Sequence, residues 1–271
     1  MGYMNTLRQL ILNDDPREFL RWAPVKMMMF PTKVSFFTNE LRYLRHLPDW
    51  QTRWRKAIRE SHTGHPLPFL LWPKSSGNLI RHAYHVARFE QETGWFVTQA
   101  NVVLDFGGGY GSMCRLFHNL GFRGKYVIFD LPLFSYLQEY YLKSLGMELA
   151  PAPTGGPMHV TCTSDFDQLR TLFGSLNTGH RTMFIATESI SEIPIKQRER
   201  ILRLIMDFDA FLLSYSDIYR EADNASYFRE WAGQFEGRMR WYGSPIKQMP
   251  GFSYLFGTRT ADHSVEANRP G

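Results

Sequence analysis

The pattern of apolar and polar positions changes near residue 100. Beyond it, short apolar runs alternate with stretches of helical length, which is typical of a mainly parallel sheet with helices on both faces. Strands are predicted at Val102–Phe106, Tyr126–Asp130, His159–Thr163, Thr182–Thr187 and Ala210–Tyr215, with helices at Ser112–Leu120, Leu133–Leu145, Phe166–Phe173 and Ile195–Phe208. Two last strands, Arg238–Tyr242 and Phe252–Arg259, predict a terminal antiparallel hairpin around Pro250-Gly251. The fold class is therefore α/β.

Upstream of residue 100 the pattern is helical. Predicted helices begin at Asp14-Asp15-Pro16 and run through Trp22, then cover Thr38–His46, Trp50–Glu60 and the stretch from the cap at Ser75-Ser76 to Glu92. The proline-rich connector Gly64–Pro73 is expected to be extended, because proline fixes its own backbone and restrains its neighbour. We expect a helical N-terminal cap and connector at residues 1–98, an α/β domain at 99–260 and a flexible tail at 261–271.

The amino-acid composition limits which classes of protein the chain can belong to. The chain has 271 residues, 44% of them hydrophobic, which is enough for a globular core. No stretch reaches the roughly 18 apolar residues of a membrane-spanning helix, and no secretory leader is expected. Cys114 and Cys162 are the only cysteines, and we expect free thiols in a reducing cytoplasm.

The net charge of +5 lies entirely in the first 65 residues, which hold eleven Lys or Arg against six Asp or Glu. A basic arm of this kind can contact a phosphate-bearing partner such as a nucleic acid, a nucleotide-sugar or an anionic lipid head group. No long Lys/Arg run is present, and a solvated helix face explains the charge more simply.

The strongest local signal is the segment Val102–Gly111, Val-Val-Leu-Asp-Phe-Gly-Gly-Gly-Tyr-Gly. An apolar run ends in Asp105, glycines follow at 107, 109 and 111, and a helix is predicted next. Glycines at a strand-to-helix turn permit unusual backbone angles and let the main chain approach a ligand. The dinucleotide spacing Gly-x-Gly-x-x-Gly fails, because its third position falls on Ser112 or Cys114.

A second signal follows at the end of the next predicted strand. Asp130 lies nineteen residues beyond Gly111, and a carboxylate there can accept hydrogen bonds from both hydroxyls of a ribose. The alternative is that Asp130 caps the next helix, since Pro132 stands where its first turn would begin. Both roles are compatible.

The spacing Asp-x-Gly-x-Gly-x-Gly resembles motif I of class I S-adenosylmethionine (SAM) methyltransferases. A larger set of segments resembles a narrower bacterial group, the sugar O-methyltransferases, over about residues 65 to 260. They are Ser76–His85, Leu104–Gly111, Tyr126–Pro132, Gln138–Leu142 and Thr187–Ile193. The resemblance implies a Rossmann-like sheet, mostly parallel with a C-terminal antiparallel hairpin, and SAM as cofactor.

The resemblance also implies roles for individual residues. The glycine turn, Gly107, Gly108, Gly109 and Gly111, would pass under the methionine part of SAM, with Asp105 near its amino group. Asp130, followed by Leu131, would bind the ribose. Ser164 and Asp165 follow the third strand, where this fold commonly contacts adenine, although Asp165 is equally placed to cap the helix that starts at Phe166.

Three residues are candidates for the catalytic chemistry. Glu188 ends the fourth strand and is expected to act as general base or to orient the acceptor hydroxyl, with a structural cap as the alternative. His82 and His85 lie three residues apart on one predicted helix and suit proton transfer, although such a pair is more often structural. The His-Asp pair that plant-type O-methyltransferases carry after this strand is absent. No metal is expected.

These observations predict a SAM-dependent O-methyltransferase acting on a hydroxyl of a sugar or sugar-containing acceptor. The alternatives are an RNA or other small-molecule methyltransferase and a catalytically inactive binding protein of the same fold. A nucleic-acid partner and a membrane span are not expected, and a homo-oligomer is left open. The Asn/Asp-Pro-Pro-Tyr/Phe motif of DNA and protein-glutamine amino-methyltransferases is absent.

Overall fold

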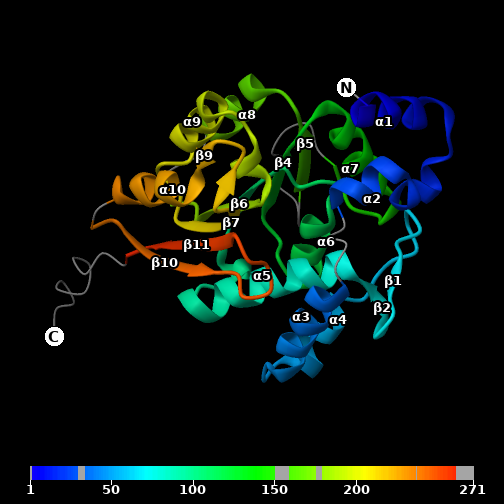
Figure 1. Ribbon diagram of the computed structural model, residues 1–271, viewed down its shortest axis with the longest axis horizontal. Coiled ribbons are helices and arrows are strands. Elements are labelled where there is room, and N and C mark those ends of the chain that lie inside the picture. The colour runs from blue at the N-terminus through cyan, green and yellow to red at the C-terminus, as the bar shows by residue number, and fades with distance from the viewer. Residues whose placement is uncertain (1, 30–33, 150–158, 175–178, 236, 261–271) are drawn as a thin grey trace.

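A seven-stranded sheet forms the centre of the computed structural model, which describes residues 2–29, 34–149, 159–174, 179–235 and 237–260 (Figure 1). The strand order is β10-β11-β7-β6-β3-β4-β5. The strands are β3 (Val102–Phe106), β4 (Lys125–Phe129), β5 (His159–Thr163), β6 (Thr182–Thr187), β7 (Ala210–Ser216), β10 (Met239–Pro245) and β11 (Phe252–Arg259). The tail predicted at 261–271 lies outside the described residues.

The direction of the strands confirms the predicted fold class. Strands β5, β4, β3, β6 and β7 pair in parallel, whereas β11 runs antiparallel to both β7 and β10. The last strand is thus inserted beside β7 and forms the expected C-terminal hairpin with β10. The protein has a Rossmann-like α/β fold with a mostly parallel sheet.

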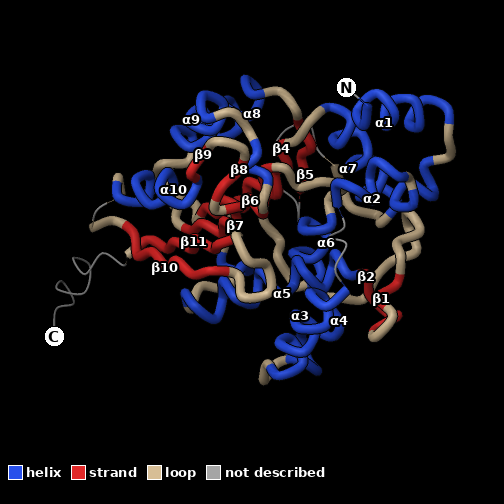
Figure 2. The backbone as a smooth tube through the Cα atoms, viewed as in Figure 1, coloured by secondary structure: helices blue, strands red, loops and turns tan. Residues whose placement is uncertain are grey.

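Helices cover both faces of the sheet, as Figure 2 shows. One face packs against α8 (Phe166–Gly174), α9 (Ile195–Leu204) and α10 (Asn224–Gly233). The other packs against α5 (Gly77–Thr93), α6 (Ser112–Asn119) and α7 (Pro132–Ser144). Consecutive residues of a strand place their side chains on opposite faces of the sheet, so one strand can contribute to both hydrophobic clusters.

The N-terminal segment contains more elements than the sequence pattern predicts. They are α1 (Gly2–Asn13), η1 (Pro16–Arg21), α2 (Ala23–Met29), α3 (Val34–His46), η2 (Trp50–Trp54), α4 (Arg55–Ala57), β1 (Pro68–Phe69) and β2 (Trp72–Ser76). Asp15 caps η1 as expected, accepting a hydrogen bond from the backbone N of Arg17 at 2.9 Å, but the helix is a 3-10 turn. The helix predicted over Trp50–Glu60 is a π turn and one α turn that ends at Ala57.

The remaining elements are short. They are η3 (Val97–Gln99), η4 (Ser189–Glu192), β8 (Ile218–Tyr219) and β9 (Ala222–Asp223). No helix in the part of the chain that the structure describes is long and apolar enough to cross a membrane. Cys114 and Cys162 are free thiols.

The N-terminal helices and the α/β part share one hydrophobic core. Leu7 of α1, Leu41 of α3 and Trp54 of η2 belong to the same buried cluster as Ile128 of β4 and Phe256 of β11. The domain boundary at residue 98 therefore stays a prediction, since burial is continuous across it.

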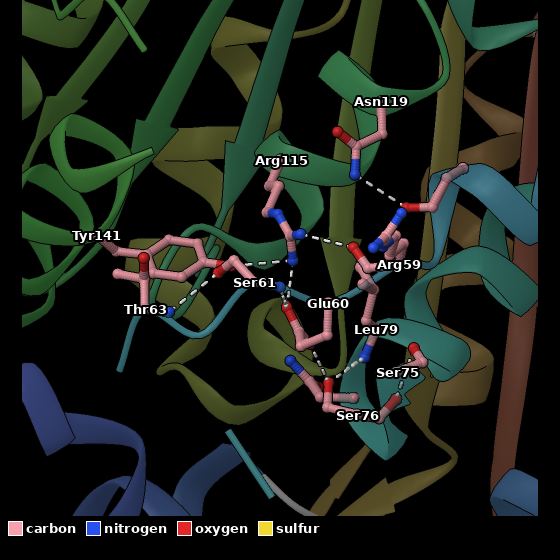
Figure 3. A network of polar contacts seen from close by, with 12 residues as sticks. Arg59, Glu60, Ser61, Thr63, Ser75, Ser76, Leu79, Arg115, Asn119 and Tyr141 are labelled. Carbon is pink, nitrogen blue, oxygen red and sulfur yellow. Dashed lines mark hydrogen bonds and ion pairs between the residues drawn. The ribbon is translucent and has the colours of Figure 1, made fainter. Parts of the chain in front are cut away.

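A buried arginine joins the N-terminal segment to the helix that follows the glycine turn (Figure 3). Arg115 of α6 forms an ion pair with Glu60 and donates through Nη2 to the carbonyl O of Arg59 at 2.6 Å. The other carboxylate oxygen of Glu60 accepts from Ser76 Oγ at 2.5 Å. Asn119 Nδ2 donates to the carbonyl O of Ala57 at 2.9 Å. These bonds fix α6, and with it the end of the glycine turn, against the cap.

Candidate functional site

The candidate site lies at the carboxyl ends of the parallel strands. Strand β3 is flanked by β4 on one side and by β6 on the other, so the chain changes direction across the sheet at β3. Ligands of open α/β sheets bind in the crevice that such a switch point creates. The predicted residues on the turns after β3, β4, β5 and β6 all belong to this edge.

The glycine turn after β3 has the backbone conformation that requires glycine. Gly107, Gly109 and Gly111 have φ angles of 70°, 59° and 94°, in the left-handed region that other residues rarely adopt. A Cβ on Gly107 would stand 2.3 Å from Cβ of Ser189, and one on Gly108 would stand 2.8 Å from Oδ2 of Asp105. The turn therefore has no room for side chains.

We expect Gly107→Ala to lower the free energy of unfolding by about 2 to 4 kcal/mol, because it combines a positive φ with a steric overlap. The matched control is Gly146→Ala, at a φ of 75° with no atom within 4 Å of the added Cβ. That control measures the cost of a side chain at positive φ without the steric overlap, about 1 kcal/mol. Urea denaturation of both variants measures the difference, and equal losses would contradict the packing argument.

Asp130 binds the glycine turn directly. Its Oδ2 accepts a hydrogen bond from the backbone N of Gly109 at 2.9 Å, and its Oδ1 accepts from the backbone N of Leu131 at 2.7 Å. Burial raises its pKa to about 6. The N-cap of α7 is Leu131, which is 53% exposed, and no side chain caps this helix. The expected alternative that Asp130 caps α7 is therefore wrong.

Gln138 is a further residue of this site, for which the sequence predicted no role of its own. It is fully buried on α7, and its Nε2 donates to the carbonyl O of Gly109 at 2.8 Å. Its Oε1 is buried and has no hydrogen-bond partner among the described residues. The sequence feature that could have pointed to Gln138 is an amide side chain on the apolar face of a predicted helix. Such an amide needs a hydrogen-bond partner, because buried polar groups are normally hydrogen-bonded.

Asp105 lies beneath the turn. It is 2% exposed, and its Oδ2 accepts a hydrogen bond from the hydroxyl of Tyr126 at 2.9 Å. Burial raises its pKa to about 7, with the nearby Asp130 adding to the rise. In this structure its carboxylate supports the turn from the sheet side. Its predicted role near the cofactor amino group stays a prediction.

The turn after β5 contains Ser164 and Asp165, which are both exposed. Oδ1 of Asp165 accepts from the backbone N of Asp167 at 2.8 Å and, more weakly, from that of Gln168 at 3.4 Å. The capping alternative for Asp165 is therefore confirmed. A contact of Ser164 and Asp165 with adenine stays a prediction.

Glu188 follows β6 and has a strained backbone. Its φ of 71° is unusual for a residue with a side chain, and such strain is often found at functional sites. Its backbone N donates to the carbonyl O of Ser214 at 2.7 Å. The next residue, Ser189, donates through Oγ to the carbonyl O of Phe106 at 2.5 Å. This bond holds Glu188 beside the glycine turn.

Glu188 is also paired with a buried arginine from the cap side of the sheet. Arg81 of α5 donates through Nη2 to Oε1 of Glu188 at 2.5 Å, and it is 4% exposed. Its Nη1 lies 3.6 Å from Oε1 of Glu40 on α3. Oε2 of Glu188 makes no hydrogen bond with any described residue, so one carboxylate oxygen is available. Neither Arg81 nor Glu40 was predicted, because their link to Glu188 is purely tertiary.

The pKa of Glu40 predicts a pH dependence of stability. Burial raises it from 4.5 to about 7, and the nearby Glu188 adds to the rise although Arg81 opposes it. Between these two pH values the folded state holds a proton that the unfolded state has lost, so stability falls as pH rises. The free energy of unfolding falls by about 3 kcal/mol over this pH range.

We therefore expect Glu40→Gln to remove most of this fall between pH 4.5 and 8, as measured by urea denaturation at several pH values. Glu139→Gln, which changes an exposed ion pair with Lys143, is the control and should follow the unmodified protein. A Glu40→Gln profile parallel to that of the unmodified protein would contradict the buried, protonated carboxyl.

The two histidines of α5 both have a lowered pKa. His85 is 1% exposed, and its Nδ1 lies 2.6 Å from the hydroxyl of Tyr254 on β11. Burial and the charge of Arg81 lower the pKa of His85 well below its usual value and that of His82 to about 3. Nδ1 of His82 has no partner among the described residues. Arg81, their neighbour on the same helix, reaches Glu188; catalytic roles for the histidines stay predictions.

The N-terminal cap meets the site at Met29. A Cβ added to Gly109 would stand 2.7 Å from Sδ of Met29, the last residue of α2. At the other end of α2, a surface cavity of about 600 Å³ lies against η1. It is lined by Asp14, Asp15, Arg17, Glu18, Arg21, Trp22 and His65. Helix α2 therefore connects this cavity to the glycine turn.

Comparison with known proteins finds similarity in structure only. No family model matches the chain, and no curated protein matches it in sequence. The mitomycin 7-O-methyltransferase MmcR is 13% identical, with a TM-score of 0.38 over 87% of this chain and 75% of that one. The 16S rRNA methylase ArmA is 8% identical, with a TM-score of 0.40 over 96% and 99%.

A third similar structure is the N-terminal domain of human METTL16 in complex with SAH. It is 9% identical, with a TM-score of 0.44 over 68% of this chain and 71% of that one. Identities this low leave the chemistry of the chain to be argued from its own residues.

Proposed function

We propose that this protein is a SAM-dependent O-methyltransferase whose acceptor is a hydroxyl of a sugar or sugar-containing molecule. One observation carries the proposal. Glu188, strained and with a free carboxylate oxygen, is fastened through Ser189 to the glycine turn that Asp130 binds from the other side. A nucleotide-type turn and a carboxylate that can act as a base thus lie at the same edge of the sheet.

The residues of the turn suit an adenosyl cofactor. Glycine at positions 107, 108, 109 and 111 leaves the main chain of the turn without side chains, which lets a ligand approach it closely. Asp130 offers two carboxylate oxygens for a ribose, and the unpartnered Oε1 of Gln138 offers an acceptor for an ammonium or hydroxyl group. The failed dinucleotide spacing disfavours NAD.

SAM, when bound, supplies an electrophilic methyl group. The protein has to hold the acceptor oxygen in line and take its proton. Oε2 of Glu188 is the available proton acceptor, and Arg81 fixes the carboxylate through Oε1. In this scheme Glu188 is the catalytic residue, while Arg81 and Glu40 are positioning residues.

The cavity beside η1 supports a saccharide acceptor. Trp22 offers an indole ring, and Asp14, Asp15 and Glu18 offer carboxylates that accept hydrogen bonds from hydroxyl groups. Its volume of about 600 Å³ lies within the range of small-molecule sites.

Calorimetric titration with SAM, S-adenosylhomocysteine and NADH tests the cofactor. We expect saturable binding of both adenosyl compounds and none of NADH; NADH binding, or no adenosyl binding, would overturn the proposal. Methyl transfer to saccharides and to RNA is then measured at increasing salt concentration. A neutral sugar should show little salt dependence, whereas RNA binding should weaken steeply, and transfer to RNA alone would replace the sugar by the alternative.

A further inference from the structure

The hairpin of β1 and β2 exposes aliphatic side chains at its tip. Phe69 pairs with Trp72, so Leu70 and Leu71 form the two-residue turn between the strands. They are 84% and 55% exposed, and Leu67, the residue before β1, is 47% exposed. The hairpin projects from the molecule on the side where α3 and α4 lie (Figures 1 and 2). Exposed apolar side chains gathered at a projecting tip usually mark an interaction site.

Cations surround the base of the same hairpin. The guanidinium carbons of Arg45 on α3 and Arg55 on α4 lie 5.0 and 5.9 Å from the ring centre of Trp72. Both arginines are exposed, as are Lys56 and Lys74. No carboxylate forms an ion pair with any of these four residues in the part of the chain that the structure describes. The tip is therefore apolar and its base carries uncompensated positive charge.

We propose that this hairpin inserts into the surface of a membrane that contains anionic lipids. Leu70 and Leu71 would enter the boundary between head groups and acyl chains, while Arg45, Arg55 and Lys74 would contact lipid phosphates. An apolar wedge beside a basic rim is the arrangement by which peripheral proteins bind such surfaces. This is attachment to one leaflet, which needs no membrane-spanning helix.

The leucines favour a lipid surface over RNA. Phosphate groups of RNA would be satisfied by the arginines alone, and RNA-binding surfaces present aromatic rings for base stacking. The two side chains at the tip are aliphatic and have no polar atom to offer a base. Contact of Arg45 and Arg55 with lipid phosphates would also account for part of the positive charge of the first 65 residues, which the proposed methyl transfer does not use.

Co-sedimentation of the full chain with vesicles tests this proposal independently of catalysis. We expect binding to vesicles of phosphatidylcholine with 30 mol% phosphatidylglycerol, and at least about tenfold weaker binding to phosphatidylcholine alone or in 0.5 M salt. The double variant Leu70→Ser/Leu71→Ser should lower binding at least about tenfold. Ile218→Ser, at a 71% exposed residue of β8, is the matched control and should bind normally.

A second pair of variants tests the charge of the arginines separately from the insertion of the leucines. Arg45→Gln/Arg55→Gln should weaken binding about tenfold to thirtyfold, whereas Arg45→Lys/Arg55→Lys should retain it because the charge remains. Binding that survives Leu70→Ser/Leu71→Ser would overturn insertion and leave a site for phosphates, including those of RNA. Self-association in analytical ultracentrifugation that the leucine variant abolishes, without vesicle binding, would assign the tip to a second copy of the chain.

Discussion

Asp130→Asn is expected to weaken the binding of SAM by about 10²- to 10³-fold. The carboxylate offers two charged acceptors, and hydrogen bonds to charged groups contribute about 1.5 to 3 kcal/mol each. An amide keeps only one acceptor oxygen. Its NH₂ group would then face a backbone N–H, either that of Gly109 or that of Leu131, where the carboxylate now accepts both. The variant therefore loses the ligand contact and disturbs the turn at once.

Calorimetry measures this change, and Asp223→Asn is its control. Asp223 caps α10 by accepting from the backbone N of Ser226 at 2.9 Å, and it makes no hydrogen bond with the glycine turn. That control should lose some thermal stability but bind SAM normally. If Asp130→Asn bound SAM within about threefold of the unmodified protein, Asp130 would be a brace for the glycine turn and no part of a cofactor site.

Glu188→Gln is expected to lower kcat by about 10²- to 10⁴-fold, the usual contribution of a general base, while SAM binding changes little. The amide can still accept from Arg81 through Oε1, so the position of the side chain is preserved. It cannot take a proton from a hydroxyl. The loss should therefore fall on kcat rather than on KM for the acceptor, which single-turnover methylation assays separate.

Glu192→Gln is the matched control, because Glu192 lies at the other end of the same short helix, η4. It should retain full turnover. Arg81→Lys provides a second comparison, since a lysine keeps the charge but loses the planar guanidinium that contacts both Glu188 and Glu40. A Glu188→Gln protein with full turnover would leave proton removal to another group and return Glu188 to a structural role.

The fold followed from the sequence because its signals are local. Apolar runs of strand length and helices between them predicted the strands of the large sheet to within one residue, except that β10 runs on to Pro245, three residues beyond the predicted end. The N-terminal segment was less well predicted. Its helices α1 and α2 carry weak patterns, and the β1–β2 hairpin lies in a proline-rich stretch that reads as extended.

The sequence by itself determined the glycine turn, the acid after β4 and the edge of the sheet where they meet, since each depends on residues close together in the chain. Only the tertiary structure decided the surroundings of Glu188. Arg81 reaches it from a helix more than one hundred residues upstream, and Glu40 pairs with Arg81 from another helix. Gln138 meets Gly109 through the packing of α7 on the sheet, where the helix contacts β5. Such pairs produce no periodic pattern in the sequence, because long-range contacts depend on how helices pack and on which buried charges find a partner.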